Sequence, residues 1–127
     1  MKTLLAGILT VASLTATTQA HALIKSATCG NKKGLFAYEI QAGARGEASQ
    51  VDAWALGQLE VSVKALYIAE DVEKKEHTFV TIEPDSDGKY HTYEVTETQS
   101  GSGSLKVYDA DTKEQIDLPA LDCAISK

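Results

Sequence analysis

Two cysteines, Cys29 and Cys123, have the most definite chemistry in this sequence. They lie toward opposite ends of the chain, and neither a Cys-x-x-Cys pair nor a third cysteine accompanies them. A redox couple or a thiolate metal site is therefore disfavoured. In a short exported chain, two cysteines are most simply one disulfide. This bond would enclose roughly 95 residues, for which the chain-entropy model gives on the order of 4.5 kcal/mol of stabilisation.

Histidine is the usual general acid, general base or metal ligand, and the chain has three. His21 either leaves with the leader described below or lies at the N-terminus of the mature chain. His77 and His91 lie in the two arms of a predicted hairpin, whose register separates the rings by about five residue steps, on the order of 16 Å. One zinc ion, with ligand distances of ~2 Å, would not reach both rings. We therefore interpret each as a half-exposed strand residue and expect no metal site and no cofactor.

The remaining polar motifs do not assemble a catalytic or phosphate site. No Gly-x-Ser-x-Gly nucleophile elbow is present, and the glycine-rich stretch that contains Ser102 and Ser104 lacks the Lys-Ser/Thr of a P-loop. Asp85 and Asp87 begin an Asp-x-Asp-Gly sequence, but position 12 of a calcium loop counted from Asp85 is Thr96 instead of glutamate. A hairpin turn explains the two aspartates, and ion binding there is left open. The sequence predicts that the protein is not an enzyme.

The first 22 residues have the order of a cleaved secretory signal peptide. Lys2 is followed by an apolar run, and a small polar segment ends in an Ala-x-Ala sequence at Ala22. The apolar run is too short for a bilayer, which requires about 20 residues. We expect cleavage after Ala22, with Ala20 as the alternative. The mature domain would then span 23–127 in the periplasm or outside the cell, without stable insertion in a membrane.

Charge limits the classes of partner. The chain has 12 Lys and Arg against 18 Asp and Glu, and removal of Lys2 with the leader leaves 11 against 18, a net charge of about −7. Proteins that bind nucleic acid usually carry clusters of Lys and Arg, so a nucleic-acid partner is disfavoured. The balance is compatible with a basic protein partner, although an acidic surface that keeps the domain soluble is the commoner explanation.

Short segments of alternating hydrophobicity, separated by turn residues, predict a small all-β domain of about seven strands. The pattern favours an antiparallel sandwich or a small barrel, closed by one disulfide between the first and last strands. Segment 51–58 fits either a strand or one helical turn. The expected strands are 22–29, 35–42, 59–70, 77–83, 90–97, 105–110 and a last segment, 115–126, that Pro119 interrupts or places at an edge.

Two details of this pattern concern packing. In 59–70, alternate residues from Leu59 to Tyr67 face inward, while Leu66 and Ile68 make the other side apolar. That change indicates a bulge or a strand end covered on both faces. Trp54 is the only tryptophan, and we interpret it as a core or rim anchor.

Three connections are predicted to contact a partner, because loops on a rigid scaffold commonly carry recognition. They are 43–50, 84–89 and 98–104, and the last is expected to be flexible. The sequence thus predicts a small exported β scaffold that binds or inhibits a partner through its loops, of unspecified oligomeric state. The alternative is a structural, envelope-associated protein. The candidate partner-binding residues are Arg45, Asp85, Asp87, Ser102 and Ser104.

The layout resembles that of the periplasmic inhibitors of C-type lysozymes. It combines a leader, a short β domain, two cysteines near the ends and a late Ser/Gly-rich sequence, "GSGSLK" at 101–106. In that family a serine and a lysine from loops enter the lysozyme cleft. The resemblance covers layout and assigns no inhibitory residue to this chain.

Overall fold

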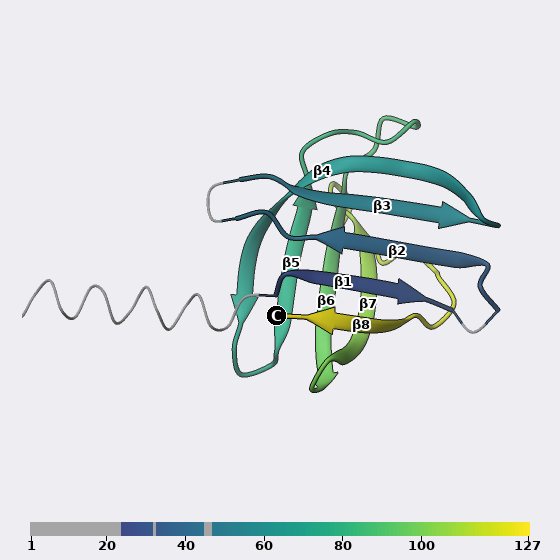
Figure 1. The fold of residues 1–127 in the computed structure, drawn as a ribbon. Helices are drawn as coiled ribbons and strands as arrows, with labels where there is room; N and C mark the ends of the chain where they lie inside the picture. The colour runs from purple at the N-terminus through teal and green to yellow at the C-terminus, as the bar shows by residue number, and fades with distance from the viewer. Residues whose placement is uncertain (1–23, 32, 45–46) are drawn as a thin grey trace, which may run out of the picture.

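The computed structural model describes residues 24–31, 33–44 and 47–127, and in this part of the chain eight strands form a closed antiparallel barrel (Figure 1). The predicted leader, with its cleavage site after Ala22, and the candidate residue Arg45 lie outside the described residues. The strands are β1 (Ser26–Gly30), β2 (Phe36–Gln41), β3 (Ser49–Ala55), β4 (Gln58–Asp71), β5 (Glu76–Thr81), β6 (His91–Gln99), β7 (Ser102–Asp109) and β8 (Asp122–Ser126).

Each strand pairs with its neighbour in sequence, and β8 pairs with β1. Closure of this kind removes the two free outer edges that an open sheet would have. The all-β prediction is confirmed. Of the two architectures that the sequence left open, a sandwich and a barrel, the structure has the barrel. The additional strand is β3, which arises from the segment that fitted either a strand or a helical turn.

Because consecutive strands run in opposite directions, their connections alternate between the two ends of the barrel (Figure 1). The β2–β3, β4–β5 and β6–β7 connections lie at one end, which we call the β4–β5 end. Ile24, before β1, and Lys127, after β8, lie at this end too. The remaining connections lie at the other end, which we call the β5–β6 end.

Side chains that point inward fill the barrel. Phe79, Ile40, Val51, Val95 and Cys29 are the largest fully buried ones, as expected for eight strands, whose interior is just wide enough for side chains. In β5, inward and outward residues alternate strictly. Trp54, near the end of β3, pairs with Ala37 and Leu59 on the outer face, so it is a rim residue and not a core residue.

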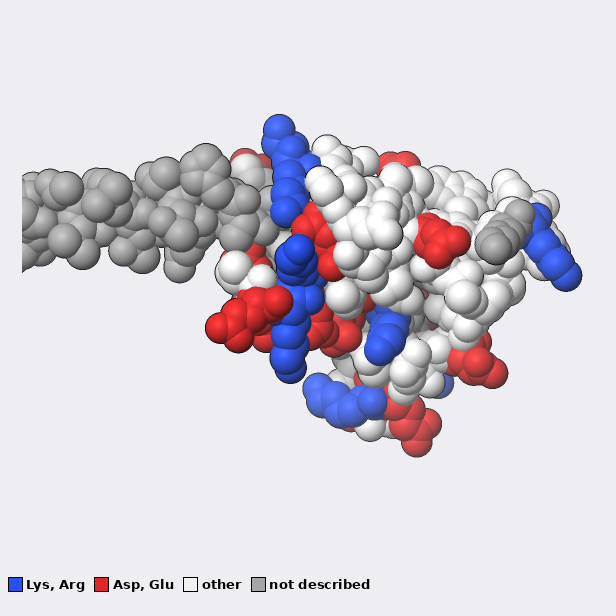
Figure 2. Space-filling model, turned by 90° about the horizontal axis from the view of Figure 1, so that it is seen from below, with Lys and Arg blue, Asp and Glu red and all other residues white. Residues whose placement is uncertain are grey.

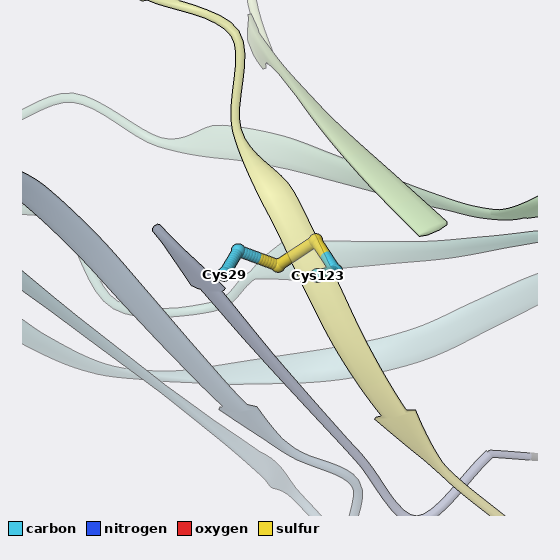
Figure 3. Close-up of a disulfide and its surroundings, with 2 residues drawn as sticks. All are labelled: Cys29 and Cys123. Atoms are coloured by element: carbon cyan, nitrogen blue, oxygen red, sulfur yellow. A yellow bond between two sulfur atoms is a disulfide. The ribbon is translucent and has the colours of Figure 1, made fainter. Parts of the chain in front are cut away.

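The disulfide joins the first and last strands, as predicted. Cys29 and Cys123 lie directly opposite each other in the β1–β8 ladder (Figure 3). They are 94 residues apart in sequence and only 1% and 5% exposed. The neighbouring β7–β8 ladder has just three residue pairs, from Ser102 to Ser104 on the β7 side. The disulfide therefore reinforces the barrel next to its shortest ladder.

β4 is the longest strand, and its register with β5 shifts between Tyr67 and Ala69. The predicted bulge is confirmed. The alternative, a strand end covered on both faces, is wrong, because Leu66 and Ile68 are 45% and 56% exposed. A bulge adds one residue to one strand and so reverses which face the following residues occupy. Tyr67 points inward before the bulge, and Glu70 points inward after it.

Segment 98–104 differs from the expected flexible loop. β6 and β7 continue through most of it and leave Ser100 and Gly101 as the turn, with Gly101 at a φ of 80°. Ser102 and Ser104 are strand residues of β7. Ladder pairing with both neighbours extended the strands into a polar, glycine-rich stretch that has little strand propensity of its own.

Removal of the disulfide tests its contribution. The Cys29→Ala/Cys123→Ala double variant is expected to lose roughly 2–5 kcal/mol in the free energy of unfolding, because the unfolded chain regains the freedom of a long loop. Urea denaturation followed by circular dichroism measures the loss. Reduced wild-type protein is the control for packing, since it keeps both sulfur atoms and should lose a similar amount. An unchanged urea midpoint in both samples would contradict the prediction.

Gly103 allows β7 to pack closely within the barrel. A Cβ atom built at this position would lie 2.1 Å from the Thr96 carbonyl oxygen and 2.7 Å from Ile125 Cδ1. Gly103→Ala is therefore expected to destabilise the protein by about 1–3 kcal/mol, measured by urea denaturation. Gly30→Ala is the matched control, because its Cβ meets nothing nearer than 3.5 Å. Equal stability of the two variants would show that the close approach costs nothing.

Candidate functional site: a charged pocket at the β4–β5 end

An open pocket of about 280 Å³ lies at the β4–β5 end of the barrel. Figure 2 shows Lys and Asp/Glu side chains crowded together toward the left of this face, whereas they are more scattered toward its right. The pocket is formed where β4 and β6 end, where β5 begins and where the chain leaves β8. Its lining residues are Glu70, Asp71, Val72, Lys75, His77, Glu97, Ser100 and Lys127.

His77 is the most deeply placed group of the pocket, with 3% of its surface exposed. It points inward with Phe79 and Thr81, because alternate residues of β5 face the core. The expectation of a half-exposed histidine is therefore wrong for His77. It is confirmed for His91, which is half-buried, with Nδ1 3.8 Å from Asp85 Oδ2.

Tyr67 holds the imidazole of His77 by a short hydrogen bond between its hydroxyl and Nδ1. The Ile24 N–H donates to the same hydroxyl oxygen at 3.4 Å. The hydroxyl proton is thus available for Nδ1, and we assign the Nε2–H tautomer to His77. Burial raises the pKa of Tyr67 to about 12, so the hydroxyl keeps its proton at physiological pH.

Burial also lowers the pKa of His77. The negative charge of Glu97 opposes this shift, and the positive charge of Lys127 adds to it. Desolvation disfavours the charged imidazolium, so His77 is neutral near pH 7. It contributes hydrogen-bonding groups to the pocket without contributing positive charge.

Glu97 and Lys127 form an ion pair inside the pocket. Lys127 Nζ lies 2.9 Å from Glu97 Oε1, and the Glu97 N–H donates to the Lys75 carbonyl oxygen at 2.9 Å. The hydrogen bond from Lys127 is the main cause of the lowered pKa of Glu97, and burial opposes it. Glu97 is 7% exposed, and the buried carboxylate is stabilised because a cation reaches it from the pocket mouth.

Glu70 faces His77 directly across the β4–β5 ladder. Its Oε2 atom is buried and has no hydrogen-bond partner among the described residues. Buried polar atoms are nearly always paired, and a buried carboxylate oxygen without a partner is costly. Glu70 is therefore the group of this pocket that a bound donor would satisfy.

The pocket contains charges of both signs with an excess of negative charge. Three carboxylates, Glu70, Asp71 and Glu97, lie against two lysines, Lys75 and Lys127. Across the described ranges, no group of three or more His, Cys, Asp and Glu side chains is placed to share a metal ion. The arrangement is suited to holding a cationic hydrogen-bond donor.

The structure describes four of the five predicted partner-binding residues and places them at two opposite ends of the barrel. Asp85 and Asp87 lie in the β5–β6 connection, at the opposite end from the pocket, whereas Ser102 and Ser104 lie on β7 toward the pocket end. Asp85 shapes its own turn, because its Oδ1 accepts hydrogen bonds from the N–H groups of Asp87 and Lys89 at 2.9 Å. The three connections proposed from the sequence therefore do not form one surface.

Sequence reasoning missed Glu70, Glu97 and Lys127. Glu97 had a usable signal, because alternation along β6 places it on the same side as Tyr93 and Val95, both buried. Glu70 had none, because its inward direction depends on the exact residue at which β4 bulges. The pairing of Lys127 with Glu97 joins residues of two different strand ends and follows only from the closed barrel.

The pH dependence of stability tests the burial of His77. The pKa of His77 in the folded protein is below the ordinary value of 6.5, so the unfolded chain takes up the proton first as the pH falls. Stability is therefore fully present above about pH 6.5 and declines as the pH falls below it. We expect wild-type protein to be less stable at pH 5.5 than at pH 7.5 in urea denaturation.

The variant His77→Gln should lose this decline, whereas His91→Gln, the matched control, should retain it. Glu97 affects stability in a different pH range. Because its pKa is lowered in the folded protein, its contribution to the free energy of unfolding is lost only as the pH falls below the ordinary value of 4.5. The same decline in wild type and His77→Gln would contradict the assignment of the effect to His77.

Among the described residues, no helix is long and apolar enough to span a bilayer. In comparisons with known proteins, no family model, no curated protein and no solved structure matches this chain.

Proposed function

We propose that this protein is an exported binding or inhibitory module that recognises a protein partner and catalyses no reaction. The observation that supports this function is the charged pocket, which lies where several connections meet at one end of a covalently closed barrel. A rigid scaffold that presents groups at the ends of its strands is a common basis for recognition. The partner would contact the β4–β5 end, with Ser102 of the neighbouring β7 strand at its border.

The disulfide supports an exported location. Bonds of this kind persist in the periplasm and outside the cell and are rare where glutathione and thioredoxin keep thiols reduced. The predicted signal peptide over residues 1–22 agrees with this compartment. We place the mature protein in the periplasm or in the external medium.

Charge supports a basic protein as the partner. The chain carries a net charge of −6, and the pocket itself has more carboxylates than lysines. Complementary charge accelerates encounter and suppresses unsuitable partners. An association of this type weakens as salt screens the charges.

A structural, envelope-associated role is the second candidate. Leu66 and Ile68 on β4 and Ile82 just beyond β5 are exposed apolar side chains. Exposed apolar side chains of this kind are able to mediate contact between copies of a protein. This role predicts self-association in place of capture of a basic partner.

A pull-down with the mature protein distinguishes the two roles. We expect immobilised protein to retain one stoichiometric partner from periplasmic or secreted material and to release it as the salt concentration rises. An unrelated protein of similar size and net charge is the control for simple ion exchange and should not retain that partner. Self-association in analytical ultracentrifugation, together with no retained partner, would contradict the binding role and support the structural one.

A further inference from the structure

We propose that the pocket at the β4–β5 end binds one cationic side chain, a lysine or an arginine, of the protein partner, with Glu70 as its counter-charge. This inference deepens the proposed function and depends on it for the identity of the ligand as part of a protein. It places the contact with the partner in the pocket around Glu70, instead of in the three connections suggested by the sequence.

The first observation is the unpaired carboxylate oxygen. The bulge in β4 turns Glu70 inward, opposite His77, and leaves its Oε2 buried without a partner among the described residues. An ammonium or guanidinium group supplies N–H donors and the opposite charge at once. A neutral donor would satisfy the hydrogen bond but not the charge.

The second observation is that the pocket already holds one ammonium group. Lys127 Nζ pairs with the buried carboxylate of Glu97 at 2.9 Å, while half of the lysine side chain stays exposed. The same lining therefore accommodates a lysine stem with its charged head on an inner carboxylate. Glu70 offers a second carboxylate in this pocket without an ion pair to a described residue, and a side chain from the partner would repeat the arrangement.

The third observation is the size and polarity of the pocket. Its volume of about 280 Å³ lies just below the range of pockets that hold drug-sized ligands, and it suits a single side chain. Val72 supplies an apolar wall for the methylene stem of a lysine or an arginine. His77 is neutral and does not repel the incoming cation.

An anionic ligand fits these groups less well. Lys127 is already engaged by Glu97, and a carboxylate or phosphate would lie near the buried oxygen of Glu70. Like charges in a partly buried site repel strongly because little water screens them. The geometry therefore favours a cation over an anion at this position.

The test uses the amides of N-acetyl-lysine and N-acetyl-arginine as probes, with the amide of N-acetyl-norleucine as the uncharged control. We expect the cationic probes to shift the backbone NMR signals of the residues that line the pocket, including Val72 and Lys75, and the uncharged probe to leave them unchanged. Glu70→Gln should weaken probe binding by at least about tenfold. Glu60→Gln, an exposed glutamate at the other end of β4, is the matched charge control and should bind as wild type does.

The same two variants are then compared in binding to the partner that the mature protein captures. We expect Glu70→Gln to weaken that complex as well and Glu60→Gln to leave it unchanged. The urea midpoint of Glu70→Gln verifies that the barrel remains folded. We expect it to, since the substitution removes the charge of a partly buried side chain and preserves its shape.

The possible failures are distinguishable. Cationic probes that shift no pocket signal, or that bind wild type and Glu70→Gln equally, would overturn the cation site even if a partner is captured. Probe binding that depends on Glu70, without capture of any partner, would support the site and contradict the proposed function. A captured partner that is indifferent to Glu70→Gln would leave the binding role intact and overturn the recognition through this pocket.

Discussion

Closure of the sheet between β1 and β8 is the constraint on which the rest of this structure depends. The two strands pair along five positions, and the disulfide between Cys29 and Cys123 lies at one of them, inside the core. Without this pairing, β1 and β8 would each present an open edge of unpaired backbone groups. The covalent link makes closure favourable for a small domain because it removes much of the freedom of the unfolded chain.

A closed barrel also determines which side chains face inward and what they meet. In the middle of the barrel, inward positions carry apolar residues such as Phe79 and Val95. Toward the β4–β5 end the same strand faces carry His77 and Glu97 instead, and these polar groups require partners of their own. Tyr67 and Lys127 supply them. The pocket is thus the polar continuation of the core at one mouth of the barrel.

The two ends of the barrel consequently have different characters. At the β5–β6 end, the aspartates Asp85 and Asp109 accept hydrogen bonds from backbone N–H groups of their own turns, so their carboxylates serve local structure. At the β4–β5 end, Glu70 keeps an oxygen that no described residue satisfies. The carboxylate that a bound donor would satisfy therefore lies at the second end, whereas two of the candidate residues from the sequence, Asp85 and Asp87, lie at the first.

The sequence by itself determined the all-β class, most of the strands and the disulfide, because these follow from local alternation, turn residues and a cysteine count that allows one pairing. It also indicated the bulge in β4 from the apolar residues Leu66 and Ile68. Only the tertiary structure decided between sandwich and barrel and extended β6 and β7 into the serine-rich stretch. It alone brought Glu70, His77, Glu97 and Lys127 into one pocket. The physical reason is that an inward direction depends on the residue at which a strand bulges and on which strands pair. Both are set by long-range hydrogen bonding and core packing, which leave no signal in a short stretch of sequence.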